Sequence, residues 1–230
     1  KRGAKIVIND LGGSVDGTGE GDAADAVVKE IEAMGGQAIA NKASVSDRSG
    51  AQSIVDDALN SFGRIDILVN NAGILRDKSF KKMSLDEWDL VLDVHLNGSA
   101  YVTHAAWPHM NAQKYGRIVL TSSGSGIYGN FGQANYGAAK MGMLGMMNVL
   151  AIEGGKNNVR VNTLAPGAAT RMIATIPGRD FDVDNPPAER SPKLVSPAVL
   201  FMCSEEAPNG AVINAMGGRY YRSQVFVNDP

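Results

Sequence analysis

Short runs of apolar and β-branched residues alternate along this chain with longer stretches of helical composition. The apolar runs predict buried strands at 4–9, 37–40, 65–70, 116–121 and 159–164. Helices are predicted between and after them, at 22–34, 48–62, 84–112, 134–154 and 194–203. Such strict alternation is typical of a mostly parallel sheet with helices on both faces. The predicted fold class is therefore a doubly wound, Rossmann-like α/β fold.

The helix predicted at 84–112 carries clear local signals. Ser84-Leu-Asp-Glu87 is a capping box, in which the Ser hydroxyl and the Glu carboxylate satisfy free amides at a helix start. His95 falls on or beside the apolar stripe of this helix. We expect Pro108 to kink or end it, because proline cannot supply the helical N–H.

Composition and charge fit one globular domain over residues 1–230. The chain has 44% hydrophobic and 20% charged residues, and 22 basic side chains are balanced by 24 acidic ones, so nothing indicates disorder or a nucleic-acid partner.

No apolar stretch has the length of a membrane span, and no secretory signal is visible, which favours an intracellular location. The single cysteine, Cys203, lies in an apolar run and is interpreted as a packed thiol. His104 and His109 lack helical partners of the metal-ligand type, so no metal site is predicted.

Tyr136 and Lys140 are the most informative pair of residues, because a spacing of four places them on one helix face. A fixed ammonium there would favour the phenolate of a tyrosine, whose pKa is ordinarily about 10. Ser122 and Ser123 end the strand before this helix. A Tyr-x-x-x-Lys pair alone is weak evidence for a function. Because the pair follows a strand-end serine, it points to acid–base chemistry.

Two other strand ends are candidate ligand sites. Asp10 follows the first visible strand, where a dinucleotide fold places a carboxylate against the adenosine ribose, which predicts NAD rather than NADP; an Asp that opens a polar turn is an equal alternative. Gly17-x-Gly19-x-Gly21 is rejected as a phosphate loop because its glycine spacing is wrong and acidic residues flank it. Asn70-Asn-Ala-Gly73 follows another strand, and taken alone would be interpreted as a simple turn.

Taken in order, these features resemble the short-chain dehydrogenase/reductase family: an acidic strand end, Asn-Asn-Ala-Gly, Ser, Tyr-x-x-x-Lys and then Pro166-Gly167. The resemblance covers nearly all of the chain. Within the family, the segments 74–80, 106–107, 115–118 and 125–136 look like the (3R)-hydroxyacyl-CoA dehydrogenase module of peroxisomal multifunctional enzymes and its bacterial relatives.

The resemblance implies a role for each matching residue. Tyr136 would exchange a proton with the substrate oxygen, Ser123 would hydrogen-bond that oxygen, and Lys140 would bind the nicotinamide ribose and lower the pKa of Tyr136. The remaining cofactor contacts would come from strand ends and the loops after them: Asp10, Ser44, Val45, Asn71, Ala72, Gly73, Pro166, Gly167 and Thr170.

Two departures from the family pattern stand out. Many members carry a catalytic Asn where this chain has His95, which would either anchor a relay water or serve as a buried structural histidine. The family's first strand, glycine-rich phosphate loop and helix are also absent before Ala4. We therefore expect an N-terminally incomplete sheet with two unpaired edges, weak NAD binding, and a native product that is longer at this end.

The predicted function is an NAD-dependent oxidoreductase that interconverts (3R)-hydroxyacyl-CoA and 3-oxoacyl-CoA, as a homo-oligomer, either dimer or tetramer. A 3-oxoacyl carrier-protein thioester, a steroid or another small alcohol are alternative substrates, and a non-catalytic scaffold is an alternative of another class. Residues 170–192 are expected to form an apolar lid over the substrate. The methionines of the helix at 134–154 would serve in a subunit interface or, more commonly, in the core. The expected location is cytoplasmic, with a peroxisome as the alternative.

Overall fold

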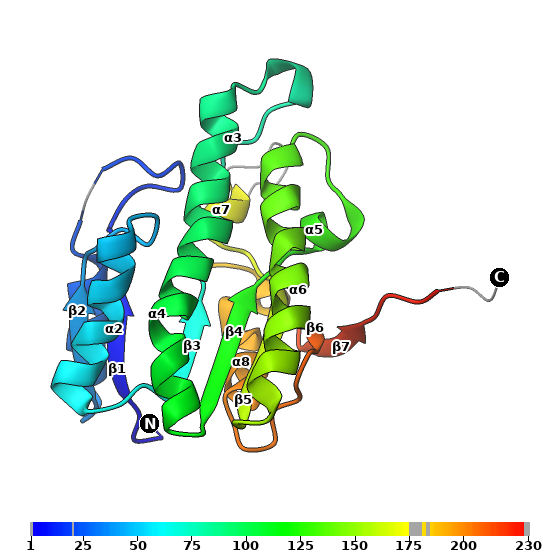
Figure 1. The fold of residues 1–230 in the computed structure, drawn as a ribbon. Helices are drawn as coiled ribbons and strands as arrows, with labels where there is room; N and C mark the ends of the chain where they lie inside the picture. The colour runs from blue at the N-terminus through cyan, green and yellow to red at the C-terminus, as the bar shows by residue number, and fades with distance from the viewer. Residues whose placement is uncertain (1, 20, 175–180, 183–184, 228–230) are drawn as a thin grey trace.

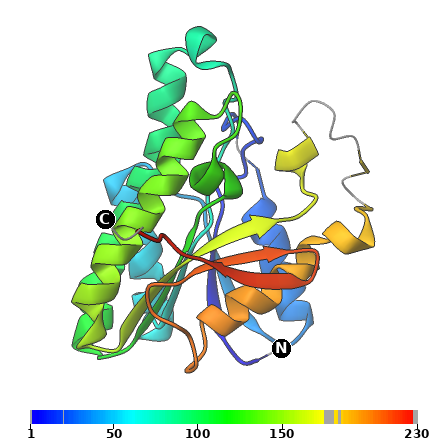
Figure 2. The ribbon, with the colours of Figure 1, turned by 90° about the vertical axis from the view of Figure 1, so that its right-hand side faces the viewer.

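The computed structural model describes residues 2–19, 21–174, 181–182 and 185–227. A twisted, mostly parallel sheet lies between two layers of helices, as Figures 1 and 2 show. The predicted fold class is confirmed. The strands are β1 (Lys5–Asn9), β2 (Gln37–Asn41), β3 (Ile67–Asn70), β4 (Gly116–Thr121), β5 (Val159–Gly167), β6 (Val212–Met216) and β7 (Arg219–Ser223).

Three long helices cover one face of the sheet, and shorter helices cover the other. The first layer contains α2 (Arg48–Phe62), α4 (Gly98–Ala112) and α6 (Ala134–Gly155), and the second contains α1 (Ala23–Ala33) and α8 (Ser196–Met202). Short helices α3 (Leu85–Leu92), α5 (Gly124–Tyr128) and α7 (Arg171–Ala174) lie near the carboxyl ends of the strands, with 3₁₀ turns η1 (Phe80–Lys82), η3 (Ala188–Arg190) and η4 (Pro192–Leu194).

The predicted helix at 84–112 is three segments in continuous succession. The capping box is confirmed: the Ser84 Oγ accepts from the Glu87 amide at 3.2 Å, and Glu87 Oε2 accepts from the Ser84 amide at 3.0 Å. A π-helical turn, η2 (Asp93–Asn97), separates α3 from α4 and contains His95. Of the two outcomes expected at Pro108, a helix end is excluded, because α4 continues through it to Ala112, whereas a kink stays a prediction.

The sheet is divided into two parts. β1 pairs in parallel with β2, whereas the order in the other part is β3-β4-β5-β6-β7, and no pairing joins β1 to β3 among the described residues. The break lies where the sequence predicts that a strand is lacking. On the open edge, the Ile67 and Val69 side chains of β3 are 41% and 40% exposed. The two parts are held together by the packing of α2 against α4.

The largest apolar core lies under α2, α4 and α6, and a smaller one lies under α8. Met143 and Met147 are almost fully buried in the first, so the methionines of α6 serve mainly in the core, although Met141 is 44% exposed. Cys203 packs against the second core, and burial raises the pKa of its thiol to about 11, which fits the expected packed thiol.

The last two strands form a hairpin that the sequence analysis missed. β6 runs parallel to β5, and β7 returns antiparallel along β6. The chain reverses at Gly217 and Gly218, whose φ angles of 57° and 72° favour glycine because a Cβ is strained there. This turn closes the sheet edge beside α8.

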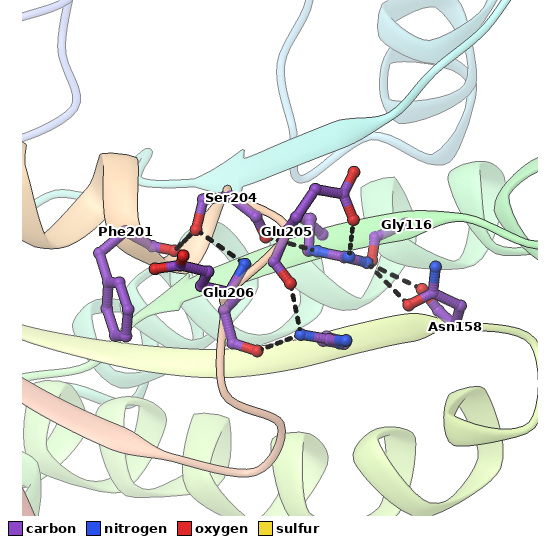
Figure 3. Close-up of polar contacts among 9 residues, drawn as sticks. Gly116, Asn158, Phe201, Ser204, Glu205 and Glu206 are labelled. Carbon is purple, nitrogen blue, oxygen red and sulfur yellow. Dashed lines mark hydrogen bonds and ion pairs between the residues drawn. The ribbon is translucent and has the colours of Figure 1, made fainter.

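A fully buried arginine fastens the turn between α8 and β6 to the amino end of β4. Arg117 Nε donates to the Ser204 carbonyl at 2.9 Å, and its Nη1 donates to the carbonyls of Gly116 and Asn158 at 2.8 and 2.9 Å. Figure 3 shows these contacts together with the ion pair to Glu205, whose side chain is 76% exposed. The buried guanidinium thus satisfies three backbone acceptors.

Replacing Arg117 with Met should lower the free energy of unfolding by about 3 kcal/mol or more, because the buried carbonyls lose their donor. Urea unfolding followed by circular dichroism measures the change. The matched control is Glu205→Gln, which removes only the exposed partner and should cost less than about 1 kcal/mol. Equal losses in the two variants would contradict a structural role for the buried guanidinium.

Candidate active site

Functional side chains gather at the carboxyl ends of β3, β4 and β5, where parallel sheets bind ligands. Ser123 lies two residues after the end of β4 and caps α5, with its Oγ accepting from the Ser125 amide at 3.1 Å. Tyr136 and Lys140 lie in the first two turns of α6. The structure thus brings the predicted Ser, Tyr and Lys together.

Lys140 is buried at the base of this cluster, with only 2% of its surface exposed. Its Nζ donates to the Thr121 carbonyl at 2.6 Å and lies 5.4 Å from the centre of the Tyr136 ring. The Ser122 hydroxyl donates to the Lys140 carbonyl at 2.8 Å, which fastens α6 to the end of β4 a second time. The lysine is therefore a fixed group and not a mobile surface cation.

Burial controls the protonation of these groups. It lowers the pKa of Lys140 to about 7, and it raises the pKa of Tyr136, with a hydrogen bond from the Ser123 side chain acting in the opposite direction and the charge of Asp77 adding to the rise. The expected lowering of the Tyr136 pKa, by Lys140 together with a bound nicotinamide, stays a prediction.

His95 lies against the other side of Tyr136. The two rings meet edge to face, with centroids 5.1 Å apart and planes at 88°. His95 Nε2 contacts both the carbonyl and the amide of Ile74, at 2.8 and 3.1 Å, whereas the buried Nδ1 has no partner among the described residues. A Cβ at Gly73 would lie 2.2 Å from the His95 ring, so glycine is required for this contact.

A cavity of about 320 Å³ opens in front of Ser123 and Tyr136. Its wall includes Leu75, Gln133 and, from α7, Met172 and Ile173. The predicted lid is thus supported at its start, whereas Ile176, another of its apolar residues, lies outside the described part of the chain. The cavity is large enough for a small organic substrate beside the two hydroxyl groups.

Asn135 orients the start of α6, and the sequence analysis missed it. Its Nδ2 donates to the carbonyls of Arg76 and Glu87 at 3.3 and 3.1 Å, and its Oδ1 accepts from the Tyr136 amide at 2.7 Å. Gln133 acts similarly, with its Nε2 donating to Asp77 Oδ2 at 2.6 Å. The polar residues immediately before the tyrosine were the available signal.

Asp10, Ser44 and Val45 lie at the carboxyl ends of β1 and β2, in the smaller part of the sheet. The Asp10 carboxylate is exposed and accepts from the Gly12 amide at 2.7 Å, with no ion pair to any described residue. Ser44 contacts Ser46 through its hydroxyl, and Val45 packs against Gly98, where a Cβ would approach within 2.8 Å. Through Val45, this part of the sheet contacts the start of α4.

The loop at 12–18 is organised around Asp16. The Asp16 carboxylate accepts from the Thr18 amide at 3.0 Å and also from the hydroxyl groups of Ser14 and Thr18, and these hydrogen bonds lower its pKa to about 2. An internal carboxylate thus occupies donors that a phosphate would need. This geometry agrees with the rejection of Gly17-x-Gly19-x-Gly21 as a phosphate loop.

The other predicted cofactor residues also lie at the carboxyl-end edge of the sheet. Asn71 and Ala72 are exposed after β3, and the Thr121 hydroxyl donates to Asn71 Oδ1 at 3.4 Å. Pro166 and Gly167 end β5, and Thr170 precedes α7. These two loops leave the carboxyl ends of β3 and β5, the strands on either side of β4.

Two further observations concern the described residues alone. Their His, Cys, Asp and Glu side chains form no group of three that could hold a metal ion. None of their helices is both long and apolar enough to cross a membrane.

Comparison with known proteins assigns the chain to a family. The short chain dehydrogenase model matches residues 12–177. A short-chain type dehydrogenase/reductase of Mycobacterium tuberculosis is 50% identical over 230 residues, which is 99% of this chain and 78% of that protein. The peroxisomal multifunctional enzyme type 2 of Mus musculus is 51% identical over 220 residues, which is 95% of this chain but only 29% of that enzyme.

A solved structure gives the same result. The short chain dehydrogenase from Mycobacterium avium superposes with a TM-score of 0.85 at 37% identity, covering 99% of this chain and 79% of that one. With its Ser, Tyr and Lys side chains at the ends of parallel strands, the chain belongs to the short-chain dehydrogenase/reductase family of oxidoreductases.

Proposed function

We propose that this oxidoreductase uses NAD to interconvert a (3R)-hydroxyacyl-CoA and the corresponding 3-oxoacyl-CoA. The observation that carries the proposal is that Ser123 and Tyr136 line the same cavity, with Lys140 and His95 buried behind the tyrosine. The acyl-CoA substrate rests on the likeness of the flanking segments to the multifunctional-enzyme module. A 3-oxoacyl carrier-protein thioester and a steroid or small alcohol are the alternative substrates.

In oxidation, Tyr136 takes the proton of the substrate hydroxyl, and in reduction it returns a proton to the ketone oxygen. The Ser123 hydroxyl donates to the same oxygen and positions it. Bound NAD supplies the hydride acceptor, and its reduced form supplies the hydride donor. Because burial raises the pKa of Tyr136, the phenol keeps its proton at neutral pH, so this side chain is prepared for reduction and needs a higher pH for oxidation.

The residues at the ends of β1 and β2 fit a dinucleotide. The Asp10 carboxylate is exposed and free of ion pairs within the described structure, so both of its oxygens can accept from the two ribose hydroxyls. Its negative charge opposes a 2′-phosphate, which favours NAD over NADP. Ser44 and Val45 would border the adenine, Asn71 with Ala72 and Gly73 the adenosine path, and Pro166, Gly167 and Thr170 the nicotinamide.

His95 acts as a neutral positioning group. Burial, assisted by the charge of Lys140, lowers its pKa to about 3. The imidazole therefore stays uncharged beside Lys140 and holds the Tyr136 ring by its edge. Its unpartnered Nδ1 can bind a water that connects to the lysine.

The chain is also proposed to form a homo-oligomer. On α6, the side chains of Met141, Val149 and Ile152 are 44%, 54% and 82% exposed, although the same helix buries Met143 and Met147. An exposed apolar stripe on a long helix is suited to contact a second copy.

Tyr136→Phe should reduce turnover of (3R)-hydroxyacyl-CoA by at least about 10²-fold, because the proton-transferring hydroxyl is lost. NAD affinity should change little, since the ring remains. Absorbance of reduced nicotinamide measures turnover, and fluorescence titration measures the affinity. The matched control is Tyr101→Phe, which alters a tyrosine that contacts Arg48 and does not line the cavity; near-normal turnover in Tyr136→Phe would contradict the assignment.

Asp10→Ala should weaken NAD binding by about tenfold, because a charge-assisted hydrogen bond to the ribose is lost. NADP binding should strengthen at the same time as the repulsion disappears. The ratio of the two dissociation constants is the measurement. Asp22→Asn is the matched control, since Asp22 is paired with Lys42; an unchanged ratio in Asp10→Ala would remove the carboxylate from the cofactor site.

The low pKa of His95 predicts a pH dependence of stability. The folded pKa of about 3 lies below the ordinary histidine pKa of 6.5, so between these pH values the unfolded chain binds a proton that the folded chain does not. Stability contributed by neutral His95 is therefore complete above pH 6.5 and is lost as the pH falls toward 3. His95→Asn should flatten this acid-side decline in urea unfolding, whereas His104→Asn, at an exposed position, should leave it unchanged.

A further inference from the structure

The wall of the substrate cavity is braced from outside by residues 76–82. The Lys78 amide donates to the Gly132 carbonyl at 2.9 Å, and Asp77 accepts from Gln133 at 2.6 Å. Gly129, Asn130 and Gln133 line the cavity on the inner side of that contact. Figure 2 shows the segment that leads into α3 beside the loop before α6. A substrate that extends out of the cavity past Gly129, Asn130 and Gln133 would therefore meet residues 76–82.

This segment carries an excess of positive charge. Arg76, Lys78, Lys81 and Lys82 lie within seven residues, against the single acid Asp77. Lys78 is paired with Glu87 at 2.6 Å, and Arg76 Nε donates to the Asp16 carbonyl at 2.8 Å.

Lys81 and Lys82 differ from those two cations. Both are exposed, and neither forms an ion pair within the described part of the chain. Two adjacent ammonium groups are therefore available to an anion at this surface.

An exposed aromatic side chain accompanies these lysines. Phe80 is 74% exposed, and its ring is steadied by an edge contact with Trp88, at 6.3 Å between centroids and 72° between planes. Phe131, in the loop before α6, and Tyr128, the last residue of α5, are 89% and 71% exposed. Aromatic faces next to cations are the pairing that binds a base by stacking and its phosphates by charge.

We propose that Phe80, Lys81 and Lys82 bind the phosphorylated adenosine end of CoA, while the acyl end lies in the cavity beside Tyr136. The proposal rests on the proposed acyl-CoA function. The adenine would stack on the free face of Phe80, and the phosphates would bind the two ammonium groups. The exposed phenylalanine favours a nucleotide over an acidic carrier protein, which would need the charges alone.

The test compares Lys81→Ala/Lys82→Ala with the charge-matched control Lys29→Ala/Lys193→Ala, whose lysines are exposed on α1 and η4. With (3R)-hydroxyacyl-CoA, the first variant should raise KM by about tenfold at unchanged kcat, because the exposed contacts of both ammonium groups with the phosphates are lost. With the same acyl group on pantetheine, which lacks the nucleotide, KM should not change. Phe80→Ala should show the same selective loss.

Two results would overturn the proposal. One is an unchanged KM for the CoA substrate, and the other is an equal loss for the CoA and pantetheine thioesters. A KM increase confined to an acyl carrier-protein thioester would assign the lysines to a protein partner and also reject the nucleotide site.

A binding experiment separates this proposal from the proposed function. Adenosine 3′,5′-bisphosphate is titrated calorimetrically onto the protein in saturating NAD, so that the cofactor's adenine site is occupied. Binding that is lost in Lys81→Ala/Lys82→Ala supports the site even if no thioester is turned over. No binding to the unaltered protein rejects the site even if the chain oxidises hydroxyacyl thioesters.

Discussion

The hydrogen bond from Lys140 Nζ to the Thr121 carbonyl, 2.6 Å long, is the contact on which the active-site geometry depends. It fastens the second turn of α6 to the last residue of β4 inside the protein, where both residues are buried. Ser123 follows that strand end by two residues, and Tyr136 lies one helical turn before the lysine. Fixing one contact between strand and helix therefore fixes the two hydroxyl groups relative to each other, which is the precondition for shared work on one substrate oxygen.

The electrostatics of the cluster follow from its burial. Lys140, His95 and Tyr136 each have a pKa shifted toward the neutral form, and desolvation is the leading cause for all three. Neutral groups reduce the cost of packing three titratable side chains around one ring. The pKa values of these groups are also sensitive to a bound ligand. A charge on the ligand acts here at low dielectric and shifts them more than it would at the surface.

Sequence reasoning succeeded where the determinant is local. The capping box at Ser84, the apolar strand β4 and the Tyr-to-Lys spacing each depend on a few neighbouring residues, and each has the expected form. It failed where distant residues decide. The π-helical turn at His95 and the hydrogen bonds of Asn135 depend on segments tens of residues away, and the pKa of Tyr136 depends on how deeply the ring is buried. The hairpin at Gly217-Gly218 was readable locally from its glycine pair and was overlooked.

The divided sheet places a particular demand on α4. The proposed cofactor residues Asp10 and Val45 belong to the two-stranded part, whereas Tyr136 is attached to the five-stranded part, and no β-bridge joins the two among the described strands. Their relative position is therefore set by helix packing, and at Gly98 the contact with Val45 is close enough to exclude any Cβ. Gly98 directly follows the π-helical turn that carries His95. With the cofactor placed as proposed, the same few residues would align the adenosine side with the reacting side, and a small shift of α4 would separate hydride transfer from proton transfer.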